Sequence, residues 1–334
     1  MIAKNTQSGK VKANPKVHKK DRPIRTIVSG INHPTEKTAE IAERELDEFV
    51  TKLPSYIQDT THFLRKIEEI KHEFPPNGIL FTMDVKSLYP NVPRKEGLNA
   101  CRRALQERTR QRIPTEAVMQ MLETTLDNNI FQFNESNYIQ TEGTAIGSRL
   151  GRNFACTYLG VWEEELMSMS ATKPWKYLRY VGDIWGIWDG NIEQLQEFHK
   201  RANSIHPNIQ VTMDHSSKSV SFLDVMITIE NDTNTIQTDV YVKETDKHVY
   251  VHSTSEHPAS TKRSIPYGLG IRAKRICSTD EKYQKQRQHI INNLEKRGYN
   301  PVKVNDTLRK VDSLERLQLL KYNNDRKSQA SDRI

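Results

Sequence analysis

Residues 79–90 read Ile79-Leu-Phe-Thr-Met-Asp84-Val-Lys-Ser-Leu-Tyr89-Pro90. The short apolar run that ends at Val85 predicts a buried β-strand. Asp84 would then emerge where this strand leaves the core. A lone aspartate at such a place is most often a cap or turn residue, so a chemical role for Asp84 requires a partner elsewhere in the chain.

A second aspartate with similar surroundings is Asp183. The segments Trp175–Val181 and Ile184–Trp188 predict a β-hairpin with Gly182 and Asp183 at its tip. An ordinary turn explains these two residues equally well when they are taken alone. If a folded sheet brings Asp84 and Asp183 together, the two carboxylates are suited to hold divalent metal ions against a phosphate chain.

The composition excludes several classes of protein. The chain has 334 residues, of which 35% are hydrophobic and 28% charged, a globular balance. No apolar run approaches the roughly 20 residues that a membrane span needs. Cys101, Cys156 and Cys277 are far apart and form no CxxC pair, so neither a disulfide framework nor a cysteine zinc site is predicted. We expect an intracellular protein in a reducing compartment, with nucleus and cytoplasm both left open.

The net charge of +8 is concentrated at the two ends of the chain. Residues 1–25 carry eight Lys and Arg against one acid, and residues 257–334 carry eighteen against eight, so the stretch between them is acidic. This pattern favours a central core with basic surfaces for a polyanion. Solvated basic helices and a tail remain an alternative on charge alone.

Periodicity and breakers predict alternating helices and strands. The expected helices cover residues 34–53, 59–70, 115–126, 154–167 and 191–205, and from 258 onward the chain reads as helix with breaks near 277 and 297–301. The expected strands cover residues 25–29, 79–85, 130–133, 138–140, 175–181, 184–188, 209–213, 220–229 and 235–243. The first 20 residues show no periodicity.

Further sequence blocks accompany the two aspartates in a fixed order. They are Pro15-Lys-Val-His-Lys19 with Arg25-Thr-Ile-Val-Ser29, Gln140-Thr-Glu-Gly143-Thr-Ala-Ile-Gly147-Ser148, Arg179-Tyr-Val-Gly-Asp183, Val220-Ser-Phe-Leu-Asp224-Val, Tyr241-Val-Lys-Glu-Thr-Asp246, Ser255-Glu-His-Pro258 and Arg297-Gly-Tyr299. With the stretch around Asp84, this order resembles reverse transcriptases. Its details resemble the Penelope-like retroelement family, which is related to telomerase.

The resemblance implies an α/β (α+β) chain with the right-hand polymerase fold. Residues 1–229 would form the fingers and palm, and residues 230–334 a β-hairpin followed by a basic, helix-turn-helix-like thumb region. The implied activity is RNA-directed DNA polymerisation on an RNA template and a DNA primer, from deoxynucleoside triphosphates. Because these elements often continue into a GIY-YIG nuclease, we expect a truncated copy. No membrane partner is implied, and the oligomeric state is open.

The resemblance also implies roles for particular residues. Asp84 and Asp183 would be the catalytic metal ligands for two Mg²⁺ ions, with Mn²⁺ as an alternative. Tyr89 would lie under the sugar and exclude a 2′-hydroxyl. The other residues expected at the nucleotide are Arg22, Arg25, Gln140, Gly143 and Gly147, with Lys20 as a weaker candidate. The residues expected to grip the template–primer backbone are Lys262, Arg263, Arg272, Lys274 and Arg275.

The chain departs from the family pattern at two positions. Gly182 stands where an expected metal ligand would be, and Arg152 stands where the loop usually has proline. Loss of a residue that only supports a ligand costs about 10–100-fold in affinity or activity, and loss of a ligand should cost more. We therefore expect impaired polymerisation. The alternatives are a catalytically inactive nucleic-acid-binding remnant and a non-functional copy that folds poorly.

For three other side chains, an ordinary structural role is the favoured interpretation. Lys218 could donate a proton to pyrophosphate, but an exposed hairpin lysine is the favoured interpretation. His252 and His257 do not have zinc-ligand spacing with Cys277, so surface or capping histidines are predicted.

Overall fold

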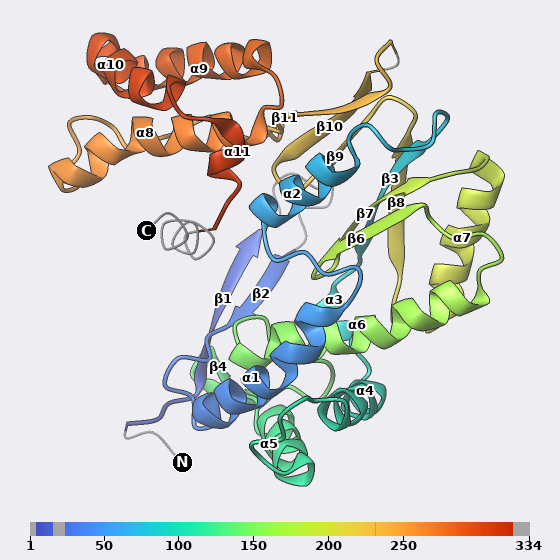
Figure 1. The fold of residues 1–334 in the computed structure, drawn as a ribbon. Helices are drawn as coiled ribbons and strands as arrows, with labels where there is room; N and C mark the ends of the chain where they lie inside the picture. Colours follow the sequence, from blue (N-terminus) through green and yellow to red (C-terminus); the bar gives the residue numbers. More distant parts are fainter. Residues whose placement is uncertain (1–4, 16–23, 231, 323–334) are drawn as a thin grey trace, which may run out of the picture. The chain divides into compact units, whose positions relative to one another are not determined.

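The computed structural model describes residues 5–15, 24–230 and 232–322 (Figure 1). The chain divides into two compact units, Met1–Ile57 with Phe81–Asp214, and Gln58–Leu80 with His215–Ile334. The expected division at residue 229 into fingers and palm and a thumb-like region concerns function and stays a prediction. None of the described helices is long and apolar enough to cross a membrane.

The first unit contains a four-stranded sheet. Its strands in spatial order are β6 (Lys176–Tyr180), β7 (Asp183–Trp188), β3 (Ile79–Val85) and β8 (Val211–Ser216). The strand predicted at residues 79–85 is confirmed to the residue. Its apolar side chains form part of the core, since Phe81 and Met83 are only 0% and 2% exposed. The sheet therefore holds Asp84 at the end of a buried strand.

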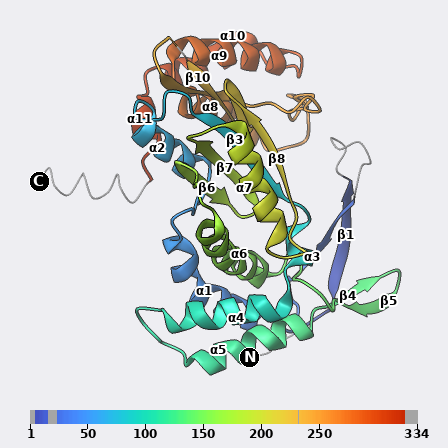
Figure 2. The same ribbon diagram turned by 90° about the vertical axis from the view of Figure 1, so that its right-hand side faces the viewer.

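Two helices cover one face of this sheet (Figure 2). They are α6 (Arg149–Met169) and α7 (Ile192–Ser204). The Phe198 ring of α7 has its centroid 5.4 Å from that of Trp188 in β7 and 6.4 Å from that of Phe81 in β3. From β6, the buried Arg179 donates through Nε to Glu163 Oε1 of α6 over 2.7 Å. Both helices thus approach the sheet from the same side.

A further group of helices packs beside α6. It consists of α1 (Glu36–Lys52), α3 (Leu88–Asn91), α4 (Arg94–Gln106) and α5 (Thr115–Asp127). The predictions of α1 and α5 are confirmed, whereas the sequence does not predict α4. The buried face of α4 consists largely of small residues, among them Gly97, Ala100 and Cys101. A Cβ on Gly97 would lie 2.4 Å from Phe154 Cζ, so α4 and α6 pack too closely for a larger side chain.

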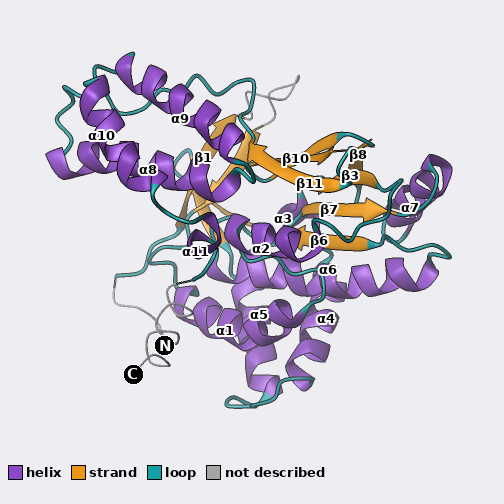
Figure 3. Cartoon of the chain, turned by 45° about the horizontal axis from the view of Figure 1, so that its top comes forward, coloured by secondary structure: helices purple, strands orange, loops and turns teal. Residues whose placement is uncertain are grey.

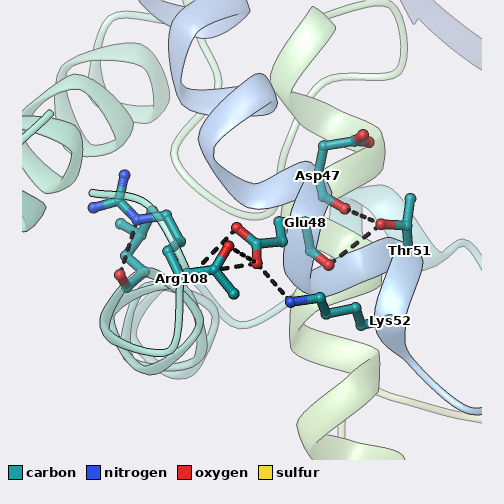
Figure 4. A network of polar contacts seen from close by, with 7 residues as sticks. Asp47, Glu48, Thr51, Lys52 and Arg108 are labelled. Atoms are coloured by element: carbon teal, nitrogen blue, oxygen red, sulfur yellow. Dashed lines mark hydrogen bonds and ion pairs between the residues drawn. The ribbon is translucent and has the colours of Figure 1, made fainter. Parts of the chain in front are cut away.

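Glu48 of α1 fastens this helix to the loop that follows α4 (Figure 4). Its carboxylate accepts hydrogen bonds from Lys52 Nζ (2.6 Å) and from Thr109 Oγ1 (2.7 Å). These donors lower the pKa of Glu48 to about 2. The loop is also held by Arg108, whose Nε donates to Leu105 O over 2.9 Å.

A second sheet of the first unit has the order β2-β1-β4-β5. Its strands are β1 (Gly9–Pro15), β2 (Ile24–Val28), β4 (Ile130–Phe133) and β5 (Ser136–Ile139). The predicted hairpin of β4 and β5 and the predicted strand β2 are confirmed within a residue or two. The sequence analysis predicts no strand in the first 20 residues, where the structure has β1. This strand is mostly exposed, so it carries no hydrophobic alternation that could be detected.

The second unit begins with α2 and a three-stranded sheet. Its elements are α2 (Thr60–Ile70), β9 (Ser219–Phe222), β10 (Val225–Glu230) and β11 (Thr235–Val240), with the sheet order β11-β10-β9. The prediction of one strand over residues 220–229 is wrong. Phe222 pairs with Val225 across a tight hairpin, and Leu223 adopts a φ of 55°. A leucine in the left-handed region is rare, so the sequence offers no turn signal here.

Four helices complete the second unit (Figure 3). They are α8 (Ala259–Ile276), α9 (Asp280–Glu295), α10 (Pro301–Asp312) and α11 (Arg316–Leu319). Both predicted breaks are confirmed, and each is followed by a capping residue. Thr279 accepts a hydrogen bond from Lys282 N at the start of α9, and Asn300 accepts from Lys303 N at the start of α10. The core of this helical module includes Tyr283, Leu294 and Leu308.

Candidate active site

Strand pairing brings the two aspartates together. Val85 N–H donates to Gly182 O over 3.0 Å. At the other end of the pair, the Phe81 ring occupies the space beside Gly186, since a Cβ there would be 2.4 Å from Phe81 Cζ. Val85 is thus matched with Gly182, and the earlier residue Phe81 with the later residue Gly186. The residue numbers run in opposite directions, so the two strands are antiparallel. The same register places Asp84 opposite Asp183, where Cβ atoms are usually about 4.5–5.5 Å apart.

Both aspartates point away from the covering helices. Side chains alternate along a strand, so Asp84 lies on the face opposite to Phe81, and Asp183 on the face opposite to Trp188. Phe81 and Trp188 are the residues that contact α7. Asp84 is half-buried and Asp183 is exposed. The sheet thus presents a carboxylate pair on the face that α6 and α7 leave uncovered.

The turn of this hairpin differs from the predicted one. Tyr180 pairs with Asp183, so the connecting residues are Val181 and Gly182, and the prediction that Asp183 lies at the tip is wrong. Val181 takes the positive φ of 57° that such a turn demands, although it is β-branched. Gly182 does not adopt a positive φ. Glycine is therefore not required at this position by the backbone.

The local space also permits a side chain at residue 182. A Cβ on Gly182 would lie 3.4 Å from Leu88 Cδ2 and 3.6 Å from Val85 Cβ, which are ordinary contact distances. Among the described residues, no group of three His, Cys, Asp or Glu side chains is placed to hold a metal ion. Two carboxylates still fit Mg²⁺, which takes few protein ligands and completes its octahedron with phosphate oxygens and water.

Tyr89 follows β3 in the short helix α3. Ser87, with a φ of 48°, turns the chain into this helix. The ring lies against α6, because a Cβ on Gly151 would be 3.3 Å from Tyr89 Cε1. Burial raises the pKa of Tyr89 to about 12, against the opposing positive charges of Arg152 and Arg25. The phenol is therefore neutral at any physiological pH.

The glycine-containing loop at residues 140–148 is held by backbone contacts. Gly143 has a φ of 62°, and a Cβ there would be 2.3 Å from Pro90 O. Gly147 has a φ of 113°, and a Cβ there would be 2.3 Å from Val28 O. Both glycines are thus needed for the loop to approach other parts of the protein. Their predicted contact with a nucleotide stays a prediction.

Gln140 and Arg94 fix the start of this loop. The Gln140 side chain accepts from Asn129 Nδ2 and donates to Glu142 O, both over 2.8 Å. Arg94 of α4 donates through Nη2 to Gln140 O (2.5 Å) and through Nε to Gly143 O (3.0 Å). The sequence analysis missed Arg94, because no local pattern connects it to a loop more than forty residues away.

Arg25 lies on β2, which is attached to the same loop. Val28 N–H donates to Ile146 O over 2.8 Å, and Arg25 is exposed. Arg22 and Lys20 fall outside the described residues. Arg152 is half-buried in the first turn of α6, where burial lowers its pKa but a hydrogen bond with Tyr56, together with Cys156 and Tyr180, raises it overall. Positive charge thus surrounds Tyr89 from two elements.

The basic residues predicted to grip a nucleic acid are mostly engaged within the second unit. Lys262 Nζ donates to Ser255 O (2.7 Å), and Arg272 Nε donates to Asp224 Oδ2 (2.9 Å). Lys274 Nζ lies 3.4 Å from Asp280 Oδ1 and 4.4 Å from the Tyr283 ring centroid. Arg275 is half-buried. Of these five residues, only Arg263 is exposed and makes no hydrogen bond or ion pair with another described residue. Their role toward nucleic acid stays a prediction.

The side chains for which ordinary roles were predicted have such roles. His252 Nδ1 lies 2.8 Å from Thr254 Oγ1, and His257 Nδ1 lies 3.2 Å from Ser255 Oγ. Lys218 is exposed at the turn between β8 and β9.

Comparison with known proteins identifies the fold. The telomerase of Candida albicans, solved in complex with a TWJ fragment of telomeric RNA, is similar with a TM-score of 0.65 at 10% sequence identity over 91% of this chain and 55% of that one. Apo telomerase from Candida tropicalis gives 0.57 at 12% identity over 95% and 61%. The RNA-dependent RNA polymerase of a human picorbirnavirus gives 0.59 at 10% identity over 96% and 64%.

These likenesses confirm the predicted right-hand polymerase fold of mixed α/β class. The chain spans 55% to 64% of the length of these three proteins. A family model described as an animal helix-turn-helix domain matches residues 249–309, which include α8 and α9. A search of curated proteins found no sequence that matches.

Proposed function

We propose that this chain is a template-directed nucleic-acid polymerase, and more specifically an RNA-directed DNA polymerase of the Penelope-like retroelement kind. The observation that carries the proposal is that Asp84, near the end of β3, lies opposite Asp183, at the start of β7, on the face that α6 and α7 leave uncovered. A two-metal phosphoryl-transfer site would give both carboxylates a common role on that face.

The two carboxylates would hold magnesium in this proposal. Bound magnesium would neutralise charge on the primer oxygen, the α-phosphate and the departing pyrophosphate. Asp84 and Asp183, one from each of two neighbouring strands, would supply the carboxylate ligands. Arg25, exposed on β2, would bind the triphosphate through its planar guanidinium. Tyr89 would place its aromatic ring under the sugar and exclude a 2′-hydroxyl.

Gly182 is expected to weaken this site without dismantling it. A third carboxylate is missing from the described residues around the pair. Substrate phosphates can supply the remaining metal ligands, so a low rate of extension is expected.

A second candidate is a nucleic-acid-binding protein without turnover. It is favoured by Gly182, since loss of one ligand could abolish metal binding altogether. A non-functional copy that folds poorly would lack a cooperative unfolding transition, and the closely packed cores of both units argue against it.

Primer extension separates these candidates. The chain is incubated with a DNA primer on an RNA template, deoxynucleotides and Mg²⁺ or Mn²⁺, and Asp84→Asn serves as the matched control. We expect slow extension by the parent, loss of extension in Asp84→Asn, and duplex binding that changes by less than a few-fold. Binding without extension in either metal would refute the polymerase and leave the binding protein. Extension that survives Asp84→Asn would show that these carboxylates are not the site.

A further inference from the structure

The segment that connects β11 to α8 is bound to the helical module by individual hydrogen bonds rather than by regular structure. Arg297 Nε donates to Tyr250 O over 2.8 Å, and the Tyr299 hydroxyl donates to Val251 O over 3.0 Å. Ser253 N–H donates to Arg297 O over 3.0 Å. These bonds hold residues 250–253 at the turn between α9 and α10.

A pair of histidines makes a further contact beside these bonds. His248 of the connecting segment and His289 of α9 have their Nε2 atoms 3.1 Å apart. Their ring centroids are 4.8 Å apart and the ring planes meet at 72°. Two nitrogens bound to one tetrahedral zinc ion at about 2.0–2.1 Å are themselves about 3.3 Å apart. The spacing therefore suits a shared ion as well as a hydrogen bond between two neutral rings.

The far nitrogen of His248 has the surroundings typical of a metal ligand. Its Nδ1 lies 3.4 Å from the Tyr250 hydroxyl and 3.8 Å from Asp246 Oδ1. Asp246 is itself fixed, since its Oδ1 accepts a hydrogen bond from His248 N over 2.8 Å. Histidines that bind metals usually present their other ring nitrogen to such a carboxylate or acceptor, which leaves the lone pair on Nε2.

Backbone strain at His248 adds an independent observation. Its φ is 51°, in the left-handed region that a residue with a side chain rarely occupies. Such a conformation costs on the order of 1 kcal/mol and persists only where other contacts hold it. The imidazole of His248 lies against that of His289 on α9.

Charged groups lie near the pair on both sides. Burial, His248 and the ammonium of Lys296, which directly follows α9, lower the pKa of His289. From the connecting segment, Asp246 supplies a negative charge and Tyr250 a neutral hydroxyl. Neutral imidazole is the form that binds metals, and Asp246 offsets the repulsion between a cation and Lys296.

We propose that His248 and His289 together bind one divalent transition-metal ion, of which zinc is the representative, and so fasten the connecting segment to α9. No third His, Cys, Asp or Glu ligand is available among the described residues, so water completes the coordination and the ion is exchangeable. Imidazole ligands prefer zinc, copper and nickel to magnesium. The site is therefore distinct in chemistry from the carboxylate pair of the first unit, and it does not depend on the proposed polymerase function.

The test is a titration of the full chain with zinc chloride, followed by calorimetry at pH 7.5 and at pH 5.5. We expect one saturable site at pH 7.5 that magnesium does not compete for and that weakens at least tenfold at pH 5.5 as the imidazoles take up protons. His248→Ala and His289→Gln should each weaken zinc binding at least tenfold. His252→Ala and His257→Ala are the matched controls, since both side chains bond to neighbouring hydroxyls.

A second measurement, the melting temperature with and without zinc, distinguishes loss of the site from misfolding of a variant. Zinc should raise the melting temperature of the parent and of the two control variants but not that of His289→Gln, an exposed position on α9. Absence of saturable zinc binding by the parent would overturn the proposal. Equal loss of binding in His252→Ala and His289→Gln would overturn it as well, because adventitious surface histidines would then explain the binding.

Discussion

At the scale of single residues, position 182 controls the proposed chemistry. Gly182→Asp should raise the rate of primer extension by at least about 100-fold, because it adds a carboxylate beside Asp84 and Asp183. The substitution is sterically allowed, since the backbone φ is not positive and the nearest atoms to a Cβ lie 3.4–3.8 Å away. Single-nucleotide extension in Mg²⁺ measures the effect.

Gly182→Ala is the control for this prediction. It adds the same Cβ without a carboxylate, so it should leave extension unchanged. If Gly182→Asp extends no better than Gly182→Ala, the missing ligand is not the cause of low activity, and Arg152 becomes the next position to restore.

A second residue-scale prediction concerns the pair that joins β6 to α6. Arg179 is 3% exposed, and Glu163 accepts from its Nε and Nη2 over 2.7 and 3.0 Å. Burial would lower the pKa of Arg179, but Glu163 more than compensates and raises it. Glu163→Ala leaves the Arg179 guanidinium buried without its carboxylate partner. It should therefore lower the free energy of unfolding by about 3–5 kcal/mol.

The next residue offers a matched control. Glu164 also binds an arginine, Arg103, but on the surface, where both side chains are about half exposed. Glu164→Ala should change the free energy of unfolding by no more than about 1 kcal/mol. Urea denaturation of both variants checks the pair, and equal losses would contradict the assignment of Glu163 as a buried partner.

At the scale of elements, α8 carries two glycines in different surroundings. A Cβ on Gly270 would lie 2.7 Å from Leu308 Cδ2 and 3.2 Å from Val311 Cγ2 of α10, whereas nothing lies within 4 Å of one on Gly268. Gly270→Ala should therefore cost about 1–3 kcal/mol of stability through overpacking. Gly268→Ala should stabilise the chain by about 0.5–1 kcal/mol, because alanine favours a helix.

Thermal unfolding of the two variants tests this contrast. The melting temperature should fall for Gly270→Ala and rise slightly for Gly268→Ala. A rise in both would mean that α8 and α10 are not packed closely at Gly270.

Elements were predictable where they bury a regular apolar pattern. The strand β3 and helices α1, α2 and α5 have such patterns, and their ends agree with the structure to within about two residues. Helix α4 was not predicted because it buries mostly small residues. Strand β1 was not predicted because nearly all of its side chains are exposed. The turn between β9 and β10 was not predicted because Leu223 adopts the positive φ there. A glycine or asparagine at this position would have indicated a turn.

At the scale of the whole molecule, the basic ends predict salt-dependent binding of nucleic acid. Duplex affinity should fall steeply as salt rises, because each phosphate contact releases counterions. Arg263→Ala should lower the slope of log affinity against log salt by about 1. Lys274→Ala should change it much less, since Lys274 is held by Asp280 and the Tyr283 ring.

Fluorescence anisotropy of a labelled duplex at several salt concentrations measures these slopes. If Lys274→Ala lowers the slope as much as Arg263→Ala, the ion pair with Asp280 opens on binding. A slope that neither variant changes would place the nucleic acid on another surface.

The sequence alone was sufficient to identify the two aspartates and the strands that carry them, because apolar runs and breakers are local properties. The polymerase fold followed from the resemblance of its ordered blocks to a known family. The tertiary structure alone could decide that Asp84 lies opposite Asp183, that Gly143 and Gly147 serve the protein's own backbone, and that Arg94 holds their loop. It also decided that Gly182 has room for a side chain and that His248 meets His289. These facts depend on strand register and on contacts between residues far apart in the chain, and no local pattern encodes either.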